Sequence, residues 1–300
     1  MEVLKRALLG AALLLCACVT RDPVTLDPEG GQLMVHAVLQ AGGDTVAVLL
    51  TRVPSSGGDV PGVQPVSGAS VQIAGAGQQV QLDEAPAGFS SCTGEAGLPV
   101  PPIGPGCYAA VLPGGVQAGA RYTLAVQVPG GETVRGEAIV PAVPGIELPA
   151  AAARVGAPRD SGGQPVASIP VRWRGGGGAG FGVGLRVTAL FAGGQPVPGF
   201  TCTFGQSVGG LLPAGTDTAT VRVNLGGCEG PAGPVQHDSA HARLLVVSYD
   251  SAFTRYARLL ADYPGKPIAR ERFAAGVTGA LGLFGAVSSD VRLVTLAVVD

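Results

Sequence analysis

Alternation of apolar and other residues constrains the fold of this chain more than any other feature of its sequence. Residues 121–128, 169–174 and 220–225 each place an apolar side chain at every second position. Successive side chains of a β-strand point to opposite faces, so this spacing buries one face and exposes the other. Turn signals rich in Gly, Pro and Asp separate the alternating runs, as at residues 42–44 and 113–115. The sequence therefore predicts many short strands joined by tight turns.

The strands predicted from this pattern fall into two groups along the chain. The first group predicts an immunoglobulin-like β-sandwich over residues 32–141, with strands at 33–39, 46–52, 70–74, 80–82, 107–111, 121–128 and 133–140. A Pro- and Ala-rich segment at 142–158 is interpreted as a linker. The second group predicts another β-rich domain over residues 159–300, with strands at 168–174, 183–191, 200–204, 218–225, 242–248 and 291–298. The predicted fold class is mainly β, with a sandwich followed by a β-rich domain that contains one helix.

That helix is predicted over residues 251–262. Asp250 or Ser251 can cap its first turn, and an apolar stripe follows at helical spacing: Phe253, Tyr256, Ala257 and Leu260. Residues 263–265 (Tyr-Pro-Gly) end it. The stripe indicates core packing. The Gly-rich segment 175–184 is interpreted as a hairpin loop.

The N-terminal residues predict export and lipid attachment. Lys5 and Arg6 precede an apolar run at 7–17 that is too short to span a bilayer as a helix, which is typical of a signal peptide over residues 1–17. The run ends in Leu15-Cys16-Ala17-Cys18, which resembles a bacterial lipobox and implies acylation of Cys18. Several acyl chains would anchor the protein stably in a lipid membrane.

The residue after the acylated cysteine sets the expected location. An Asp there tends to retain lipoproteins in the inner membrane, but this chain has Val19. The resemblance therefore implies the outer membrane, with either face open, and a tether over residues 18–31.

Four further cysteines, Cys92, Cys107, Cys202 and Cys228, suggest disulfides in an oxidising compartment. Three pairings are open, and the most local one joins Cys92 to Cys107 and Cys202 to Cys228. Each such bridge would remove about 3 to 3.5 kcal/mol of unfolded-state entropy. A zinc site made of all four thiolates is the alternative, although no C-x-x-C spacing supports it.

Several short motifs suggest chemistry that their context does not favour. Residues 205–209 match the G-x-S-x-G nucleophile elbow around Ser207, and Asp217 and His237 follow in the order of a catalytic triad. The elbow needs a strand-to-helix turn, whereas residues 210–215 do not form a good helix start. An envelope serine hydrolase that uses Ser207 therefore stays an alternative, and the chain is expected to be a non-enzyme.

The remaining motifs indicate no cofactor. Residues 175–180 contain G-x-G-x-x-G, but an alternating segment follows in place of the helix that a dinucleotide needs. His237 and His241 have the spacing of a helical zinc pair but precede a predicted strand, and the acidic residues Asp59, Asp83 and Glu84 are too few for a calcium loop. With 49 Gly in the chain, motifs made mainly of glycine carry little weight, and a formal net charge of −2 without a basic run disfavours nucleic acid as a partner.

The order of local patterns is similar to a large, uncharacterised family of Gram-negative lipoproteins, a domain of unknown function. The similarity rests on residues 65–73, 82–84, 106–108 and 119–124, and near the end on 245–250, 256–260 and 279–286. Genes of this family often lie beside those of TonB-dependent outer-membrane receptors. The resemblance implies a cell-envelope binding or accessory role, with a TonB-dependent receptor as the partner. A structural surface protein or adhesin is a further alternative.

The lipobox generates the first prediction. Replacing Cys18 with Ala removes the only cysteine that has Leu three positions and Ala one position before it, so the protein should leave the membrane fraction. Fractionation, radioactive palmitate labelling and globomycin sensitivity test this. A Cys18→Ala protein that remains lipidated would show that Cys16 is the acceptor or that the motif is no lipobox.

Overall fold

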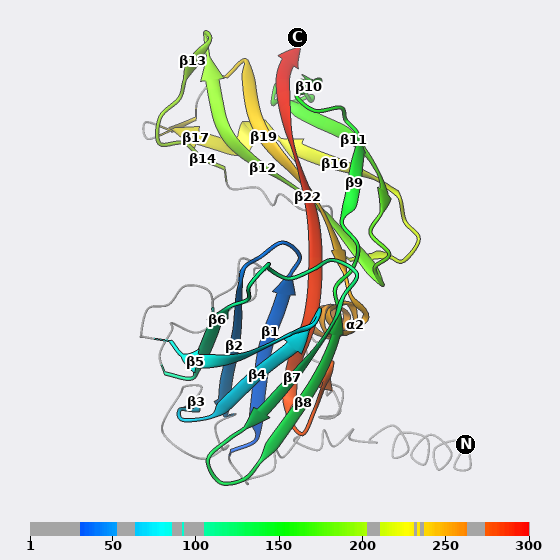
Figure 1. The fold of residues 1–300 in the computed structure, drawn as a ribbon. Helices are drawn as coiled ribbons and strands as arrows, with labels where there is room; N and C mark the ends of the chain where they lie inside the picture. The colour runs from blue at the N-terminus through cyan, green and yellow to red at the C-terminus, as the bar shows by residue number, and fades with distance from the viewer. Residues whose placement is uncertain are drawn as a thin grey trace, which may run out of the picture.

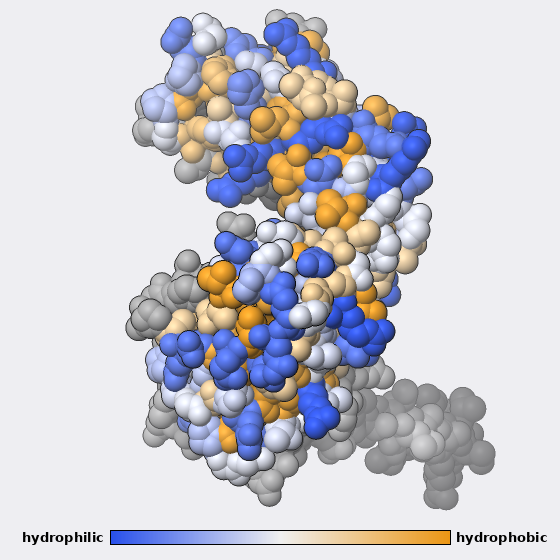
Figure 2. All heavy atoms as spheres, viewed as in Figure 1, coloured by the Kyte–Doolittle hydropathy of each residue, from blue (hydrophilic) through white to orange (hydrophobic). Residues whose placement is uncertain are grey.

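The computed structural model describes residues 31–52, 64–85, 92, 105–202, 211–230, 233–234, 237–262 and 274–299. The protein is mainly β, as predicted, and its strands form two lobes (Figure 1). Figure 2 shows a hollow between the lobes on one side, while they stay joined along the other. Among the described residues, no helix has both the length and the hydropathy needed to cross a membrane. The predicted signal peptide and Cys18 lie outside the described residues.

The lower lobe in Figure 1 is built from the first group of predicted strands. They are β1 (Leu33–Gln40), β2 (Thr45–Arg52), β3 (Gln64–Pro65), β4 (Ser70–Gly75), β5 (Gln78–Glu84), β6 (Cys107–Val111), β7 (Arg121–Gln127) and β8 (Thr133–Ile139). Apart from the two-residue β3, the predicted strands lie within a few residues of these bounds. Neighbours pair in the order β1-β2-β6-β5-β4-β7-β8, and the alternating positions of these strands, such as Val35, Val48 and Ile73, form one core.

The upper lobe packs two sheets around a second core. One sheet contains β9 (Pro144–Leu148), β11 (Val166–Gly175) and β16 (Thr218–Asn224); the other contains β10 (Ala153–Pro158), β12 (Gly180–Ala192), β19 (Ser239–Tyr249) and part of β22 (Leu281–Val299). Trp173 of β11 and Phe181 of β12 meet in the core with ring centroids 5.6 Å apart. The shorter elements are β13 (Gln195–Pro196), β14 (Thr201–Cys202), β15 (Leu212–Pro213), η2 (Leu225–Gly227), β17 (Cys228–Gly230), β18 (Gly233–Pro234), β20 (Ala274–Ala275) and β21 (Val277–Thr278).

Strand β22 runs through both lobes (Figure 1). Its first part lies parallel to β1, from Met34↔Leu281 to Gln40↔Val287, and its last part lies parallel to β10. On its other side it pairs with the whole of β19. At about 3.3 Å per residue, its 19 residues extend about 60 Å. β22 is therefore a spine to which both lobes are hydrogen bonded.

The spine contributes to both lobes, so the two lobes do not coincide with the predicted domains at 32–141 and 159–300. Phe284 and Ala286 belong to the lower core, whereas Val294 and Leu296 belong to the upper one. The lower core thus needs residues from the very end of the sequence. A parallel partner must come from a distant part of the chain, because parallel strands cannot be joined by a tight turn.

Two further expectations about connections are corrected. The segment 142–158, expected to be a linker, contains β9 and β10, whose residues Ile146 and Ala157 are buried in the upper core. Both strands are too short and too rich in Pro and Ala for the alternation to stand out. Residues 175–184 form no hairpin either, because β11 and β12 belong to different sheets.

Helix α2 (Ser251–Asp262) has the bounds that its sequence predicts. The carboxylate of Asp250 accepts a 2.7 Å hydrogen bond from the Phe253 N–H and thereby caps the first turn. Ala252 and Phe253 pack on Leu283 of β22, on the face of the strand that points away from the two lobe cores. Leu260, the last residue of the predicted stripe, is 37% exposed, so this contact is made mainly by the first turns of the helix.

Gly282 lets the spine lie against β1. It adopts a φ of +104°, and a Cβ atom there would be 1.9 Å from the carbonyl oxygen of Val35. The obstacle is main chain of the paired strand, which cannot move aside without breaking the ladder. A side chain at this position is therefore incompatible with the observed pairing.

We expect Gly282→Ala to lower the free energy of unfolding by about 2 to 4 kcal/mol, because it combines a backbone clash with an unfavourable φ. Gly119 is the matched control: its φ is +79°, and no atom lies within 4 Å of the position that a Cβ atom would take there. Gly119→Ala should cost only about 1 kcal/mol, from φ alone. Urea denaturation of both variants measures the difference, and equal losses would contradict the clash.

Candidate functional site

A cavity of about 270 Å³ lies where the two lobes meet. Its walls come from three segments: the end of β8, the loop before β12 and the first turn of α2 with its cap. The lining residues are Glu137, Ala138, Ile139, Pro141, Gly177, Gly178, Ala179, Asp250 and Ser251. One wall thus belongs to the lower lobe and another to the upper lobe, so the cavity depends on how the spine joins them.

Glycines at 176 and 178 bring the loop before β12 onto the end of β19. The Ala179 N–H donates to the Tyr249 carbonyl oxygen at 2.8 Å, and the buried Ser248 hydroxyl donates to the Gly176 carbonyl oxygen at 2.9 Å. A Cβ atom on Gly178 would be 2.3 Å from the Ser248 hydroxyl oxygen. The G-x-G-x-x-G segment therefore packs against a strand, and β12 follows it where a dinucleotide site would need a helix.

Asp250 is the buried acidic group of the cavity. Only 6% of its surface is exposed, and its backbone N–H donates to the Ala286 carbonyl oxygen of the spine at 3.0 Å. Burial raises the pKa of the Asp250 carboxyl to about 6, although hydrogen bonds from main-chain N–H groups and the charge of Arg255 act in the opposite direction. Glu137, across the cavity, is exposed and paired with Arg121 at 2.6 Å. The cavity therefore holds one carboxyl that titrates near neutral pH and one that is neutralised by an arginine.

Polar side chains of the spine fix the chain beside this cavity. The Ser288 hydroxyl donates to the Ala142 carbonyl oxygen at 2.7 Å, and the Asp290 carboxylate accepts from the Ile146 N–H at 2.8 Å. Arg292 donates to the Pro149 carbonyl oxygen at 3.2 Å. These bonds hold residues 142–149 on β22. The polar side chains at the waist, the part of the spine between the two lobes, therefore satisfy main-chain groups.

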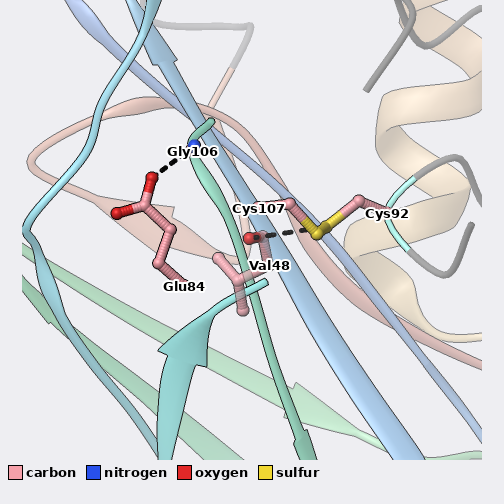
Figure 3. Close-up of a disulfide and its surroundings, with 5 residues drawn as sticks. All are labelled: Val48, Glu84, Cys92, Gly106 and Cys107. Atoms are coloured by element: carbon pink, nitrogen blue, oxygen red, sulfur yellow. Dashed lines mark hydrogen bonds between the residues drawn. A yellow bond between two sulfur atoms is a disulfide. The ribbon is translucent and has the colours of Figure 1, made fainter. Parts of the chain in front are cut away.

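The four cysteines of the described chain form two local disulfides. Cys92 is bonded to Cys107 at the start of β6, as Figure 3 shows, and the Cys92 sulfur lies 3.9 Å from the Val48 carbonyl oxygen. Cys202 of β14 is bonded to Cys228 of β17. Each bridge stays within one lobe.

Glu84 has a structural role beside the first disulfide. Its carboxylate accepts the Gly106 N–H at 2.9 Å, drawn in Figure 3, and the Gly68 N–H at 3.2 Å. A hydrogen bond from the Ser67 side chain, together with these two main-chain bonds, lowers the pKa of Glu84. The carboxylate oxygens of Glu84 therefore accept hydrogen bonds from loop residues. Asp59, the other acidic residue considered with Asp83 and Glu84 for calcium, lies outside the described residues.

The predicted catalytic and metal-binding residues are not brought together into a described site. Ser207 lies outside the described residues; Asp217 is exposed and its carbonyl oxygen accepts the Trp173 N–H at 3.0 Å. His237 is buried, while His241 is exposed on β19 with its ring centroid 4.7 Å from that of Phe191. In the described ranges, no three His, Cys, Asp or Glu residues are grouped so that they could hold a metal ion.

The sequence did not predict the cavity, although it did predict one of its lining residues, Asp250. The helix cap at Asp250 was visible in the sequence, and it marks one wall. Glu137 and the loop at 177–179 carry no motif that links them to Asp250. Only the tertiary fold brings β8, the loop before β12 and the start of α2 together.

Comparison with known proteins gives a family match over part of the chain. Residues 21–167 match the family model of a domain of unknown function (DUF4249), a span that includes the lower-lobe strands up to the start of β11. No curated protein matches the chain. A crystal structure of the FN1–FN3 domains of chicken CNTN1 is similar at 12% identity over 74% of this chain and 60% of that one, with a TM-score of 0.15. This score supports no structural argument, so the β-rich fold is established by the strands themselves.

The raised pKa of Asp250 predicts how stability depends on pH. Since the carboxyl binds its proton more tightly in the folded state than at its ordinary value of 3.8, the protonated form favours folding. This contribution is complete below pH 4 and is lost as pH rises through about 6, at a cost of about 2 to 3 kcal/mol. Asp250→Asn keeps a capping side chain and removes the titration.

Denaturant unfolding of both proteins between pH 4 and pH 7.5 measures this effect. The free energy of unfolding of the wild type should fall relative to that of Asp250→Asn as pH rises. A constant difference between the two proteins would show that the carboxyl does not titrate in this window.

Proposed function

We propose that this protein is a lipid-anchored binding or accessory protein of the cell envelope and that it partners a TonB-dependent outer-membrane receptor. The observation that carries the proposal is the order of two features along the chain. A lipobox ends at Cys18, and the match to the domain of unknown function begins at residue 21. The partner comes from the lipoprotein family that the sequence resembles.

The described buried polar groups support a binding role over catalysis. The buried Ser248 and Ser288 and the half-buried Asp290 use their side chains for hydrogen bonds with main-chain groups where the lobes meet. Asp250 caps a helix. A catalytic centre needs a nucleophile, a base and an orienting group within hydrogen-bond reach of one another, and these side chains instead stiffen the joint between the lobes.

The course of the chain gives the proposed anchor a direction. β1 begins at Leu33 at the base of the lower lobe, and the upper lobe lies at the opposite end of the spine (Figure 1). A tether from residue 18 to residue 31 reaches at most about 50 Å when fully extended. An anchored protein would therefore present its upper lobe farther from the lipid surface than its lower lobe.

Affinity isolation from envelope extracts tests the proposal. We expect the tagged wild-type protein, cross-linked in intact cells, to recover a TonB-dependent receptor. The Cys18→Ala variant should recover much less receptor, because it is not held beside it. Repeated isolation of the wild-type protein as a lone monomer would contradict the receptor partnership.

An activity probe covers the hydrolase alternative. A fluorophosphonate should label the intact protein no more than it labels Ser207→Ala. Labelling that disappears in Ser207→Ala would replace the binding role with serine chemistry.

A further inference from the structure

The outer side of one upper-lobe sheet concentrates positive charge. On β10, β12, β19 and β22, the residues that point away from the core include Arg154, Arg186 and Arg243, all exposed. Together with the aliphatic residues Val291 and Leu293 between them, these side chains define what we call the arginine face. The residues of this face alternate along each strand with buried core residues. Because successive side chains of a strand point to opposite sides, the residues of the face point away from the core.

Strand register places the three arginines close together. Arg186 is directly opposite Arg243, and Arg243 is directly opposite Leu293. Arg154 is opposite Thr295, the next outward position on the spine. With neighbouring strands about 5 Å apart, the three side chains start within about 15 Å of one another on four adjacent strands.

No acidic side chain of the described sheet neutralises this face. Among the described residues, the outward positions of the four strands carry no Asp or Glu. Four arginines elsewhere in the described chain are paired with a carboxylate: Arg52 with Glu132, Arg121 with Glu137, and Arg172 and Arg174 with Glu147. Arg154, Arg186 and Arg243 form no such pair with the described residues.

This arrangement has an electrostatic cost within the protein. Like charges directly opposite on adjacent strands destabilise a sheet, which is the situation of Arg186 and Arg243. In a chain with a formal net charge of −2, the cluster is a local excess of positive charge. A negatively charged partner on the face would remove the repulsion.

The face also exposes aliphatic surface. Val291 and Leu293 are 51% and 59% exposed, and Leu245 lies beside Val291 in the pairing. The corresponding side of the first part of β22 is covered by α2, through Leu283 and Val287. Helix α2 does not extend as far as Val291. This side of the spine is therefore buried in the lower lobe and exposed in the upper lobe.

We propose that the arginine face binds an acidic protein surface that carries apolar side chains among its carboxylates. Guanidinium groups pair with carboxylates through two parallel hydrogen bonds, and aliphatic residues between arginines are typical of the centre of a protein interface. The inference names the chemistry of the partner, and in that respect it rests on the proposed function. A protein fits better than a lipid bilayer, because the face belongs to the lobe farther from the N-terminal end of the described chain.

Binding of the full chain to defined polymers tests this inference without any receptor or membrane. The probes are poly-L-glutamate and a glutamate–tyrosine copolymer, measured at low and at physiological salt. We expect Arg154→Gln combined with Arg186→Gln and Arg243→Gln to weaken binding to both polymers about tenfold, with a loss of affinity for the wild type as salt rises. Leu293→Ser should weaken binding to the copolymer more than binding to poly-L-glutamate, since only the copolymer offers apolar groups.

The matched control removes the same charge from other surfaces. Arg135, Arg222 and Arg258 are exposed and lie outside the face, and their combined replacement by Gln should change the affinity less than about twofold. Equal losses in the two triple variants, or no binding of the wild type to either polymer, would overturn the proposal. Stronger binding to vesicles of anionic phospholipid than to the polymers would also overturn it, in favour of a lipid surface. None of these results depends on recovering a receptor, so failure here is distinguishable from failure of the envelope partnership.

Discussion

The hydrogen bonding of β22 to both lobes is the constraint on which the rest of the structure depends. A single strand completes the lower core with Phe284 and the upper core with Leu296. The lower core is not formed by a continuous stretch of chain, because β1 pairs with a strand that comes almost 250 positions later. Such long-range pairing raises the entropy cost of the folding transition state and makes slow folding the expectation. It also fixes the two lobes to one another, since a continuous ladder cannot bend freely between them.

The change of partners along the spine explains why polar residues gather at the waist. Between the segments that pack into the two cores, β22 carries Ser288 and Asp290, which bind main-chain groups of residues 142 and 146. Main-chain groups near a strand crossing need partners, and side chains supply them there. At the same place, Gly285 of β22 lies close to the capped end of α2. A Cβ atom on Gly285 would be 3.2 Å from the Asp250 carboxylate. The cavity, the helix cap and the spine are thus parts of one joint.

The proposed role places different demands on the two lobes. The lower lobe holds the N-terminal end of the described chain, most of the family match and the disulfide of Cys92 and Cys107. The upper lobe carries the arginine face, whose opposed like charges lower stability and for which we propose an acidic protein partner. A stiff joint between them would hold that face in a fixed orientation relative to the anchor, which reduces the entropy lost on binding.

The sequence by itself determined the local features of this protein. Alternation located the lower-lobe strands to within a few residues, and the cap, stripe and Pro-Gly stop defined α2, because each of these signals is set by neighbours only a few positions apart. The tertiary structure alone decided which strands pair. β9 and β10 were hidden in a Pro- and Ala-rich segment, and the first half of β22 was hidden by glycines such as Gly282, whose purpose is visible only against Val35. The cavity and the arginine face also depend on partners far apart in the chain. A period of two says which side of a strand is buried, but the choice of neighbour is made by the packing of the whole molecule.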